Sequence, residues 1–263
     1  MKRLAILFCI FFTTMCMKSG VVDPAEQGGK KEEDKPTPSE ITPPPSTITQ
    51  WLDGKESPLS SWYKKYLDCE HGMVLNNPAF TKYYIQYGEI STYPGGYKEN
   101  AGIFTHNNAW IICAEAYAGR GDKAFEYYSK IAPAFNEDIS DLHKTEPYVY
   151  GQMIAGKDAS RFGEGKNSWL TGTAAWNWYT ITQFILGIKP SFKGIEIDPC
   201  ISSDNKGYTV TRKFRGATYE IEIKNPSGAQ KGIKSLTING EKVQGNLVPM
   251  QPAGTVCKVV AEM

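Results

Sequence analysis

One stretch of this sequence combines residue types that could bind an anion. Residues 168–176 read Ser-Trp-Leu-Thr-Gly-Thr-Ala-Ala-Trp, a polar loop that runs into an apolar helical pattern. A helix start offers unpaired backbone N–H groups and the positive end of the helix dipole, and Gly172 would let a ligand approach that backbone. The hydroxyl groups of Thr171 and Thr173 would add donors. An ordinary helix N-cap is the commoner explanation of such residues, so both interpretations stay open on this stretch alone.

A second candidate is His106. It follows residues 98–105, a stretch that contains polar residues and a flexible glycine, Gly102. An imidazole in such a setting is typical of a site carried by a loop, although a single histidine is more often structural. His71 and His143 show no metal-ligand spacing with it, so the sequence predicts no metal site. We also find no nucleophile elbow, no P-loop and no dinucleotide-binding fingerprint.

The composition indicates a packed globular protein. The 263 residues, 41% of them hydrophobic, are enough for one or two domains. A formal net charge of +1, without a basic stripe of interleaved aromatic residues, gives no reason to expect nucleic acid as a partner. Aromatic residues make up 12% of the chain, and those that are exposed could stack on sugar rings.

The first 50 residues predict an export leader and a tether. Residues 1–20 join a basic start to an apolar run that is too short to span a bilayer, which is typical of a signal peptide. Cys16 leaves a lipid-anchored lipoprotein as an alternative, although Met15 is larger than the small residue usual before such a cysteine. Residues 21–50 are rich in proline and charge and predict a disordered linker. If the leader is genuine, the protein is exported to the periplasm.

Three helices followed by strands are expected in the rest of the chain. Apolar residues recur at helical spacing over three segments, 107–118, 122–131 and 171–188. Asp122 would cap the second helix. In residues 200–263 the apolar residues recur with a period of two, which is typical of strands, and Asn239-Gly240 indicates a β-hairpin. Residues 114–131 resemble one tetratricopeptide hairpin, but no second copy follows at a period of about 34 residues, so one helix hairpin describes them better.

A series of short motifs then occurs in a fixed order. They are Gly88-Glu89-Ile90-Ser91, Tyr93-Pro94, Gly96-Tyr97-Lys98-Glu99-Asn100, Gly102-Ile103-Phe104, His106-Asn107-Asn108, Gly119-Arg120-Gly121-Asp122, Thr145-Glu146-Pro147-Tyr148-Val149-Tyr150, the stretch 167–176, Ile197-Asp198-Pro199-Cys200-Ile201 and the stretch 211–217. Together they resemble glycoside hydrolase family 94, the cellobiose phosphorylase group. The resemblance runs from about Tyr66 to about Val248.

The resemblance implies a fold and an activity. The fold would be mainly α with a C-terminal antiparallel β unit: a partial (α/α)6-barrel catalytic domain at 51–199 and a small β domain at 200–263. The activity would be inverting phosphorolysis of cellobiose or a related β-glucoside to glucose 1-phosphate. The implied partners are a β-linked glucose disaccharide or oligosaccharide and inorganic phosphate as substrate. No metal or organic cofactor is implied, and the family is usually cytoplasmic.

The resemblance also assigns roles to seven residues, in two groups. Positions that bind phosphate in the family correspond to His106, Thr171 and Gly172. Positions that contact sugar correspond to Lys98 and Glu99, which would hold the acceptor glucose, and to Tyr93 and Gln152. From the residues alone, Tyr93 could be a packing residue and Gln152 an exposed helix residue.

Several functional positions of the family have no counterpart in this sequence: the general acid, the arginine that helps hold phosphate and most residues of the cleaved-sugar pocket. The general acid is an aspartate in an Asp-Trp-Asn-Asp stretch upstream of the position of Trp51, and no Asp-Trp-Asn occurs here. We therefore expect no catalytic residue in this chain, which would be a fragment inactive alone. An exported carbohydrate-binding or scaffold remnant and a helical-repeat interaction module are alternatives. A partial barrel would expose apolar helix faces, which predicts a homodimer or other self-association.

Overall fold

The structure, a computed structural model, describes residues 64–263. The predicted signal peptide at 1–20 and the predicted linker at 21–50 lie outside these residues. The described chain divides into two compact units, unit 1 with residues 64–111 and 127–174, and unit 2 with residues 112–126 and 175–263. The domain boundary expected between residues 199 and 200 stays a prediction.

Secondary structure in residues 64–263 is mixed. Helices account for 27% of these residues and strands for 29%, and strands occur in both units. The expectation of a mainly α chain forming a partial (α/α)6 barrel is therefore wrong. Several strands before residue 200 contain only two to four residues, too few for a period of two to stand out from the sequence.

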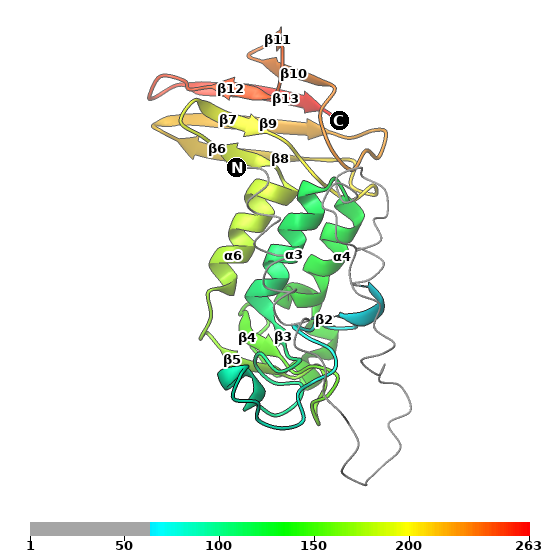
Figure 1. The fold of residues 1–263 in the computed structure, drawn as a ribbon. Helices are drawn as coiled ribbons and strands as arrows, with labels where there is room; N and C mark the ends of the chain where they lie inside the picture. The colour runs from blue at the N-terminus through cyan, green and yellow to red at the C-terminus, as the bar shows by residue number, and fades with distance from the viewer. Residues whose placement is uncertain (1–63) are drawn as a thin grey trace. The chain divides into compact units, whose positions relative to one another are not determined.

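Unit 1 contains a small antiparallel sheet that leads directly into a helix. The sheet consists, in spatial order, of β3 (Ile103–Phe104), β4 (Gly151–Ile154) and β5 (Gly165–Ser168). Ile103 pairs with Ile154 and Phe104 with Met153, and all four side chains are buried. Helix α3 (Thr105–Tyr117) follows β3 without a connecting residue (Figure 1). The first turn of α3 is thereby held against the edge of this sheet.

The other elements of unit 1 are short. They are β1 (Asp68–Cys69), β2 (Gly72–Met73), η2 (Gly88–Ser91), η3 (Pro133–Phe135), η4 (Glu137–Ile139) and α5 (Ser140–His143). Asn108 of α3 fixes β2, since its Oδ1 accepts from the Met73 N–H at 2.8 Å and its Nδ2 donates to the Met73 carbonyl at 3.0 Å. This asparagine of the His-Asn-Asn motif thus has a structural role.

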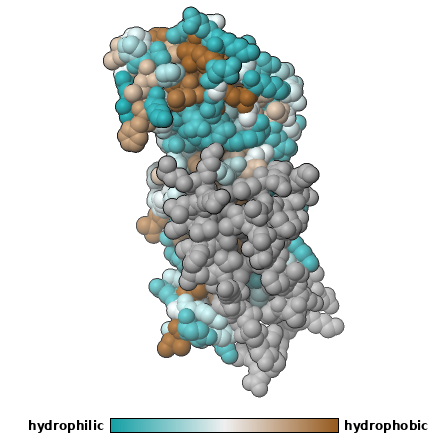
Figure 2. Space-filling model, turned by 45° about the horizontal axis from the view of Figure 1, so that its top comes forward, coloured by the Kyte–Doolittle hydropathy of each residue, from teal (hydrophilic) through white to brown (hydrophobic). Residues whose placement is uncertain are grey.

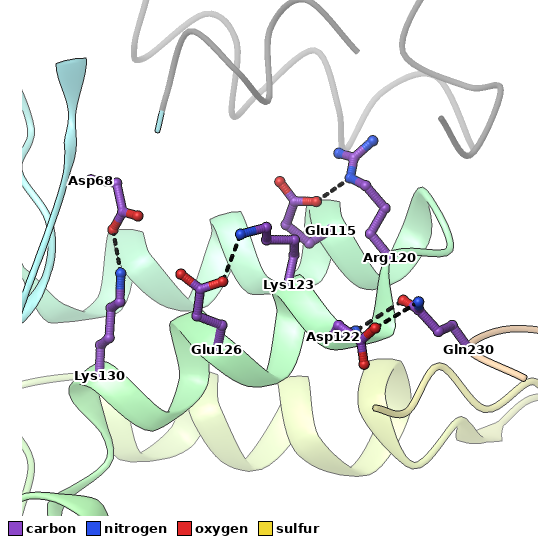
Figure 3. Close-up of polar contacts among 8 residues, drawn as sticks. All are labelled: Asp68, Glu115, Arg120, Asp122, Lys123, Glu126, Lys130 and Gln230. Carbon is purple, nitrogen blue, oxygen red and sulfur yellow. Dashed lines mark hydrogen bonds and ion pairs between the residues drawn. The ribbon is translucent and has the colours of Figure 1, made fainter. Parts of the chain in front are cut away.

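Two predicted helices, 107–118 and 122–131, are confirmed as α3 and α4 (Gly121–Ile131). A Cβ atom at Gly121 would lie 2.0 Å from the Ile201 carbonyl oxygen, so only glycine fits there. Asp122 is not the helix cap that we expected. Its carboxylate accepts from the Ser203 N–H at 2.8 Å. It also accepts from Gln230 Nε2 at 2.7 Å, as Figure 3 shows. The Gly-Arg-Gly-Asp motif therefore joins α4 to later loops of unit 2.

The third predicted helix, 171–188, is shorter than expected. It comprises α6 (Thr173–Tyr179) and a π-helical segment, η5 (Thr180–Ile185), and strand β6 begins at Ile188. In the π segment the Leu186 N–H donates to the Ile181 carbonyl, five residues back, at 2.7 Å. Threonine hydroxyls donate to the Trp176 and Trp178 carbonyls at 2.7 Å each. Such bonds compete with the regular helical pattern.

The strands of unit 2 form two sheets. One has the order β11-β10-β13-β9-β8 and the other β12-β7-β6. Their bounds are β6 (Ile188–Pro190), β7 (Gly194–Ile197), β8 (Gly207–Phe214), β9 (Ala217–Lys224), β10 (Ser235–Ile238), β11 (Glu241–Val243), β12 (Leu247–Pro249) and β13 (Val256–Glu262). The predicted hairpin at Asn239-Gly240 is confirmed, because Ile238 pairs with Glu241 and both turn residues have positive φ. The C-terminal unit is not purely antiparallel, since β9 and β13 are parallel.

Large hydrophobic side chains are exposed in both units. They are Tyr148 and Trp169 in unit 1 and Trp176, Trp178 and Phe192 in unit 2, among others. Figure 2 shows hydrophobic residues at the surface between hydrophilic ones on the face that it draws. No helix within residues 64–263 is long and apolar enough to cross a membrane.

Candidate functional site

All seven residues assigned by resemblance lie in unit 1. Tyr93, Lys98 and Glu99 lie on the loop between η2 and β3, and His106 lies in the first turn of α3. Gln152 lies on strand β4, half-buried, so it is not the exposed helix residue that was the alternative. Thr171 and Gly172 immediately precede α6.

Gln152 joins the loop that carries Lys98 and Glu99 to strand β5. Its Oε1 accepts hydrogen bonds from Lys98 Nζ and from Asn167 Nδ2, the latter at 2.9 Å. Lys98 and Asn167 both have a positive φ, near 51° and 52°, which few residues other than glycine adopt. The Lys98 N–H also lies 2.9 Å from Met153 Sδ. Asn167 was part of a motif, but only the structure shows its contact with Gln152.

Glu99 is a half-buried carboxylate with an unused oxygen. Its Oε2 is buried and has no hydrogen-bond partner among the described residues. Burial lowers the pKa of His106, and the negative charge of Glu99 opposes that shift in part. A hydrogen bond from Tyr93 Oη to Glu89 Oε1 at 3.1 Å raises the pKa of Tyr93, and the charge of Glu99 adds to it. Glu99 is therefore close enough to both residues to act on them.

His106 has the environment of a neutral imidazole. Its ring contacts Phe104 edge-on at 4.8 Å between centroids and lies 5.4 Å from the Trp110 ring. Because burial lowers its pKa below 6.5, the ring is uncharged at neutral pH. A neutral imidazole donates one hydrogen bond and accepts another, so His106 can hold an anion by an N–H group.

Three threonine hydroxyls form a chain that begins at Thr105, the residue before this histidine. Thr105 Oγ1 donates to the Gly151 carbonyl at 2.6 Å and lies 2.7 Å from Thr173 Oγ1, which lies 2.6 Å from Thr171 Oγ1. A hydroxyl has a single proton, so Thr173 must donate to Thr105, and Thr171 must donate to Thr173. The Thr171 hydroxyl therefore points its proton inward.

The backbone at this position leaves one donor available. The Thr171 N–H donates to the Trp169 carbonyl at 3.0 Å, and the Thr173 N–H donates to Thr171 Oγ1 at 3.0 Å. The Gly172 N–H has no acceptor among the described residues. Of the two residues assigned to phosphate here, Gly172 thus offers a free N–H, whereas Thr171 is already engaged.

Trp169 and Tyr148 form an exposed aromatic pair beside these loops. Trp169 is 68% exposed and Tyr148 is 75% exposed, with ring centroids 6.4 Å apart. The Trp169 indole donates to Glu146 Oε1 at 2.9 Å, which lowers the pKa of Glu146. Trp169 has a φ of 69°, a strained conformation for a bulky residue. Both residues occur in the motifs that carry the resemblance, but the resemblance assigns neither of them a role.

The arrangement has a definite chemical capacity. Lys98 and the side-chain amides of Gln152 and Asn167 can donate hydrogen bonds, and Glu99 can accept them. His106 and Gly172 offer neutral N–H groups. These are groups that bind sugar hydroxyls and an oxyanion. Within residues 64–263, no three His, Cys, Asp or Glu side chains are grouped so as to hold a metal ion.

Comparisons with known proteins find a matching family model and several relatives. Residues 55–187 match the family model described as "Glycosyl hydrolase 94 superfamily, catalytic domain". N,N'-diacetylchitobiose phosphorylase from Vibrio proteolyticus is 41% identical over 196 residues, 74% of this chain and 24% of that protein. Solabiose phosphorylase from Paenibacillus borealis is 36% identical over 197 residues, 75% of this chain and 26% of that protein. The chain spans about a quarter of the length of these relatives.

A likeness to a solved structure is much weaker. The family GH92 α-mannosidase from Bacteroides thetaiotaomicron has a TM-score of 0.27 and 16% identity, over 60% of this chain and 17% of that one. This score is too low to establish a shared fold.

Proposed function

The chain belongs to the glycosyl hydrolase 94 superfamily, and on this premise we propose that it forms the phosphate-binding and acceptor-binding part of a disaccharide phosphorylase site. In the proposed reaction a phosphate oxygen attacks the anomeric carbon of a β-linked disaccharide. The glycosidic C–O bond breaks, and the products are a sugar 1-phosphate of inverted configuration and a free acceptor sugar. Cellobiose is one proposed substrate, and the substrates named for the relatives, N,N'-diacetylchitobiose and solabiose, are the others to test.

The observation that carries this proposal is the unpaired carboxylate oxygen of Glu99. A buried acceptor without a partner costs free energy, and a sugar hydroxyl would satisfy it. Lys98 and Gln152, joined by a hydrogen bond, would orient the same ring. His106 and the Gly172 N–H would hold the phosphate, with His106 acting as a neutral donor.

The proton for the leaving oxygen has no assigned source in this chain. An inverting phosphorolysis needs a general acid there, and the sequence has no Asp-Trp-Asn motif. We therefore expect no sugar 1-phosphate when the 263-residue chain is incubated with phosphate and cellobiose or N,N'-diacetylchitobiose. Formation of sugar 1-phosphate at an enzyme-like rate would contradict this expectation.

Binding can be tested without turnover. We expect isothermal titration calorimetry to detect glucose or N-acetylglucosamine and, separately, inorganic phosphate. Glu99→Gln should abolish sugar binding and keep phosphate binding, and His106→Ala should do the reverse. If the folded chain binds neither sugar nor phosphate, the proposed function is overturned.

A carbohydrate-binding or scaffold protein without catalysis is the second candidate. The missing Asp-Trp-Asn motif favours it, because sugar binding needs no general acid. Co-expression with Vibrio proteolyticus N,N'-diacetylchitobiose phosphorylase from which the matching region has been deleted separates the two. Restored phosphorolysis would support the phosphorylase role, and sugar binding without restoration would support the second candidate. Export to the periplasm is proposed only from the sequence pattern of residues 1–20.

A further inference from the structure

A pocket of about 550 Å³ lies beside Tyr93 in unit 1. Its walls come from residues 79–83 and 91–95, together with Asp158. The volume falls within the roughly 300–1,000 Å³ of small-molecule sites. Among the seven residues assigned by resemblance, Tyr93 alone lines it. The pocket is therefore next to the proposed acceptor position and distinct from it.

The walls of this pocket are held by a fully buried side chain, that of Asn100. Its Oδ1 accepts from the Phe80 N–H at 2.7 Å, and its Nδ2 donates to the Phe80 carbonyl at 2.9 Å and the Tyr93 carbonyl at 2.7 Å. Both walls are thus joined to one residue. A preformed site loses less conformational entropy when a ligand binds.

The lining suits an uncharged polyhydroxylated ring. Two tyrosines, Tyr83 and Tyr93, are among the lining residues, and Tyr83 is 57% exposed. Lys82 and Asp158 bring one positive and one negative charge, so the pocket has no excess charge to select an anion. Aromatic faces pack against the C–H groups of a pyranose, while the charged and hydroxyl groups can bond its hydroxyls.

The pocket lies beside the segment that carries the proposed acceptor residues. Asn100, the residue after Glu99 in the sequence, fixes the Tyr93 wall through the 2.7 Å hydrogen bond to the Tyr93 carbonyl, and Tyr93 is itself assigned by resemblance to contact sugar. The pocket at Tyr93 therefore adjoins the segment that carries the acceptor carboxylate. A saccharide that extends past Glu99 toward Tyr93 would enter the pocket.

We propose that this pocket binds the second ring of a β-linked acceptor saccharide, next to the ring held by Lys98 and Glu99. The proposal rests on the proposed function, because it needs a sugar at Glu99. It implies that the acceptor side of the site accommodates two linked pyranoses.

The test is a calorimetric comparison of saccharide lengths on the full chain. Glucose and N-acetylglucosamine, with their β-1,4-linked dimers and trimers, are the probes. We expect the Kd to fall roughly threefold to tenfold from one ring to two, the scale of an aromatic contact. Tyr83→Ala should remove this gain and leave the Kd of the single sugar unchanged. The matched control is Ile85→Ala, an 82% exposed residue on the same segment outside the pocket lining, which should keep the gain.

The outcomes separate this proposal from the proposed function. If single sugars bind in a Glu99-dependent manner and longer ones gain nothing, or the gain survives in Tyr83→Ala, the pocket proposal is wrong and the proposed function stands. If no sugar binds to the folded chain, both are overturned.

Discussion

Thr173 is the central member of the hydroxyl chain that ends at Thr171. Its side chain is fully buried, and the proton order makes it a donor to Thr105 and an acceptor from Thr171. A side chain of similar shape without a hydroxyl would leave both neighbours with an unmatched polar group. Thr173 therefore positions Thr171 without contacting a ligand.

We predict that Thr173→Val lowers the free energy of unfolding by about 1–3 kcal/mol. Urea denaturation followed by circular dichroism would measure it. Thr173→Ser is the matched control, because it keeps the hydroxyl and should be clearly less destabilising. Equal losses in the two variants would show that the hydroxyl chain contributes nothing.

Two buried histidines make the stability of unit 1 depend on pH. His71 packs edge-on against Phe162 at 4.8 Å, and His143 Nδ1 lies 3.3 Å from the Gly163 carbonyl oxygen. Burial lowers the pKa of both below the ordinary 6.5. The unfolded chain therefore binds protons at a higher pH than the folded chain. Stability contributed by the neutral rings is complete above about pH 6.5 and is lost as the pH falls below it.

We predict that the free energy of unfolding decreases by up to about 1 kcal/mol per histidine between about pH 6.5 and about pH 5.5. Urea titrations at a series of pH values would measure this slope. Carboxylates titrate as well, so the comparison is with His71→Asn, which should show a shallower slope. An unchanged slope in that variant would exclude His71 as a source.

At the scale of elements, Gly121 sets the contact between the start of α4 and the loop at Ile201. We predict that Gly121→Ala destabilises the chain by about 2–4 kcal/mol, because the new Cβ would overlap the Ile201 carbonyl oxygen. Gly245→Ala is a useful control. Gly245 has a positive φ but open space around it, so its alanine variant should show only the smaller cost of backbone strain. Thermal unfolding of both variants would decide whether the overlap matters.

Local signals account for the elements that the sequence predicted correctly. Helices α3 and α4 have a continuous apolar period, and the Asn239-Gly240 hairpin depends on two adjacent residues. The parallel pairing of β9 with β13 depends on residues far apart in the chain, such as Tyr219 and Cys257, and no local pattern encodes it. The π segment after α6 depends on competing threonine hydroxyls, which the apolar period does not reveal.

In the candidate site too, the residues could be located from the sequence, whereas the contacts between them could not. Motif residues were located by resemblance, and the structure places them all in unit 1. The links between them were not predictable, since Gln152 meets Lys98 only because β4 pairs with β3. The inward proton of Thr171 requires the distances to Thr173 and Thr105. The pocket beside Tyr93 requires the Asn100 contacts, which join residues up to 20 positions apart.

At the scale of the whole molecule, exposed aromatic side chains favour association between copies. Trp178 is well exposed on α6, as is Phe192 after β6. Exposed apolar surface of this kind drives association in water. We predict that sedimentation velocity shows a concentration-dependent rise in mean mass. Trp178→Glu should reduce this rise. Lys193→Glu, which changes the charge of an exposed residue next to Phe192, should not. A monomer at every concentration would contradict this prediction.

The left-handed backbone of Trp169 has a consequence for engineering. A bulky residue at a φ of 69° costs roughly 1–2 kcal/mol, and asparagine tolerates that conformation better. Selection for heat resistance alone would therefore tend to replace Trp169. Variants enriched by this selection would lose the aromatic ring that lies two residues before Thr171. Measuring saccharide binding by the selected variants would then show whether binding and thermal tolerance compete at this position.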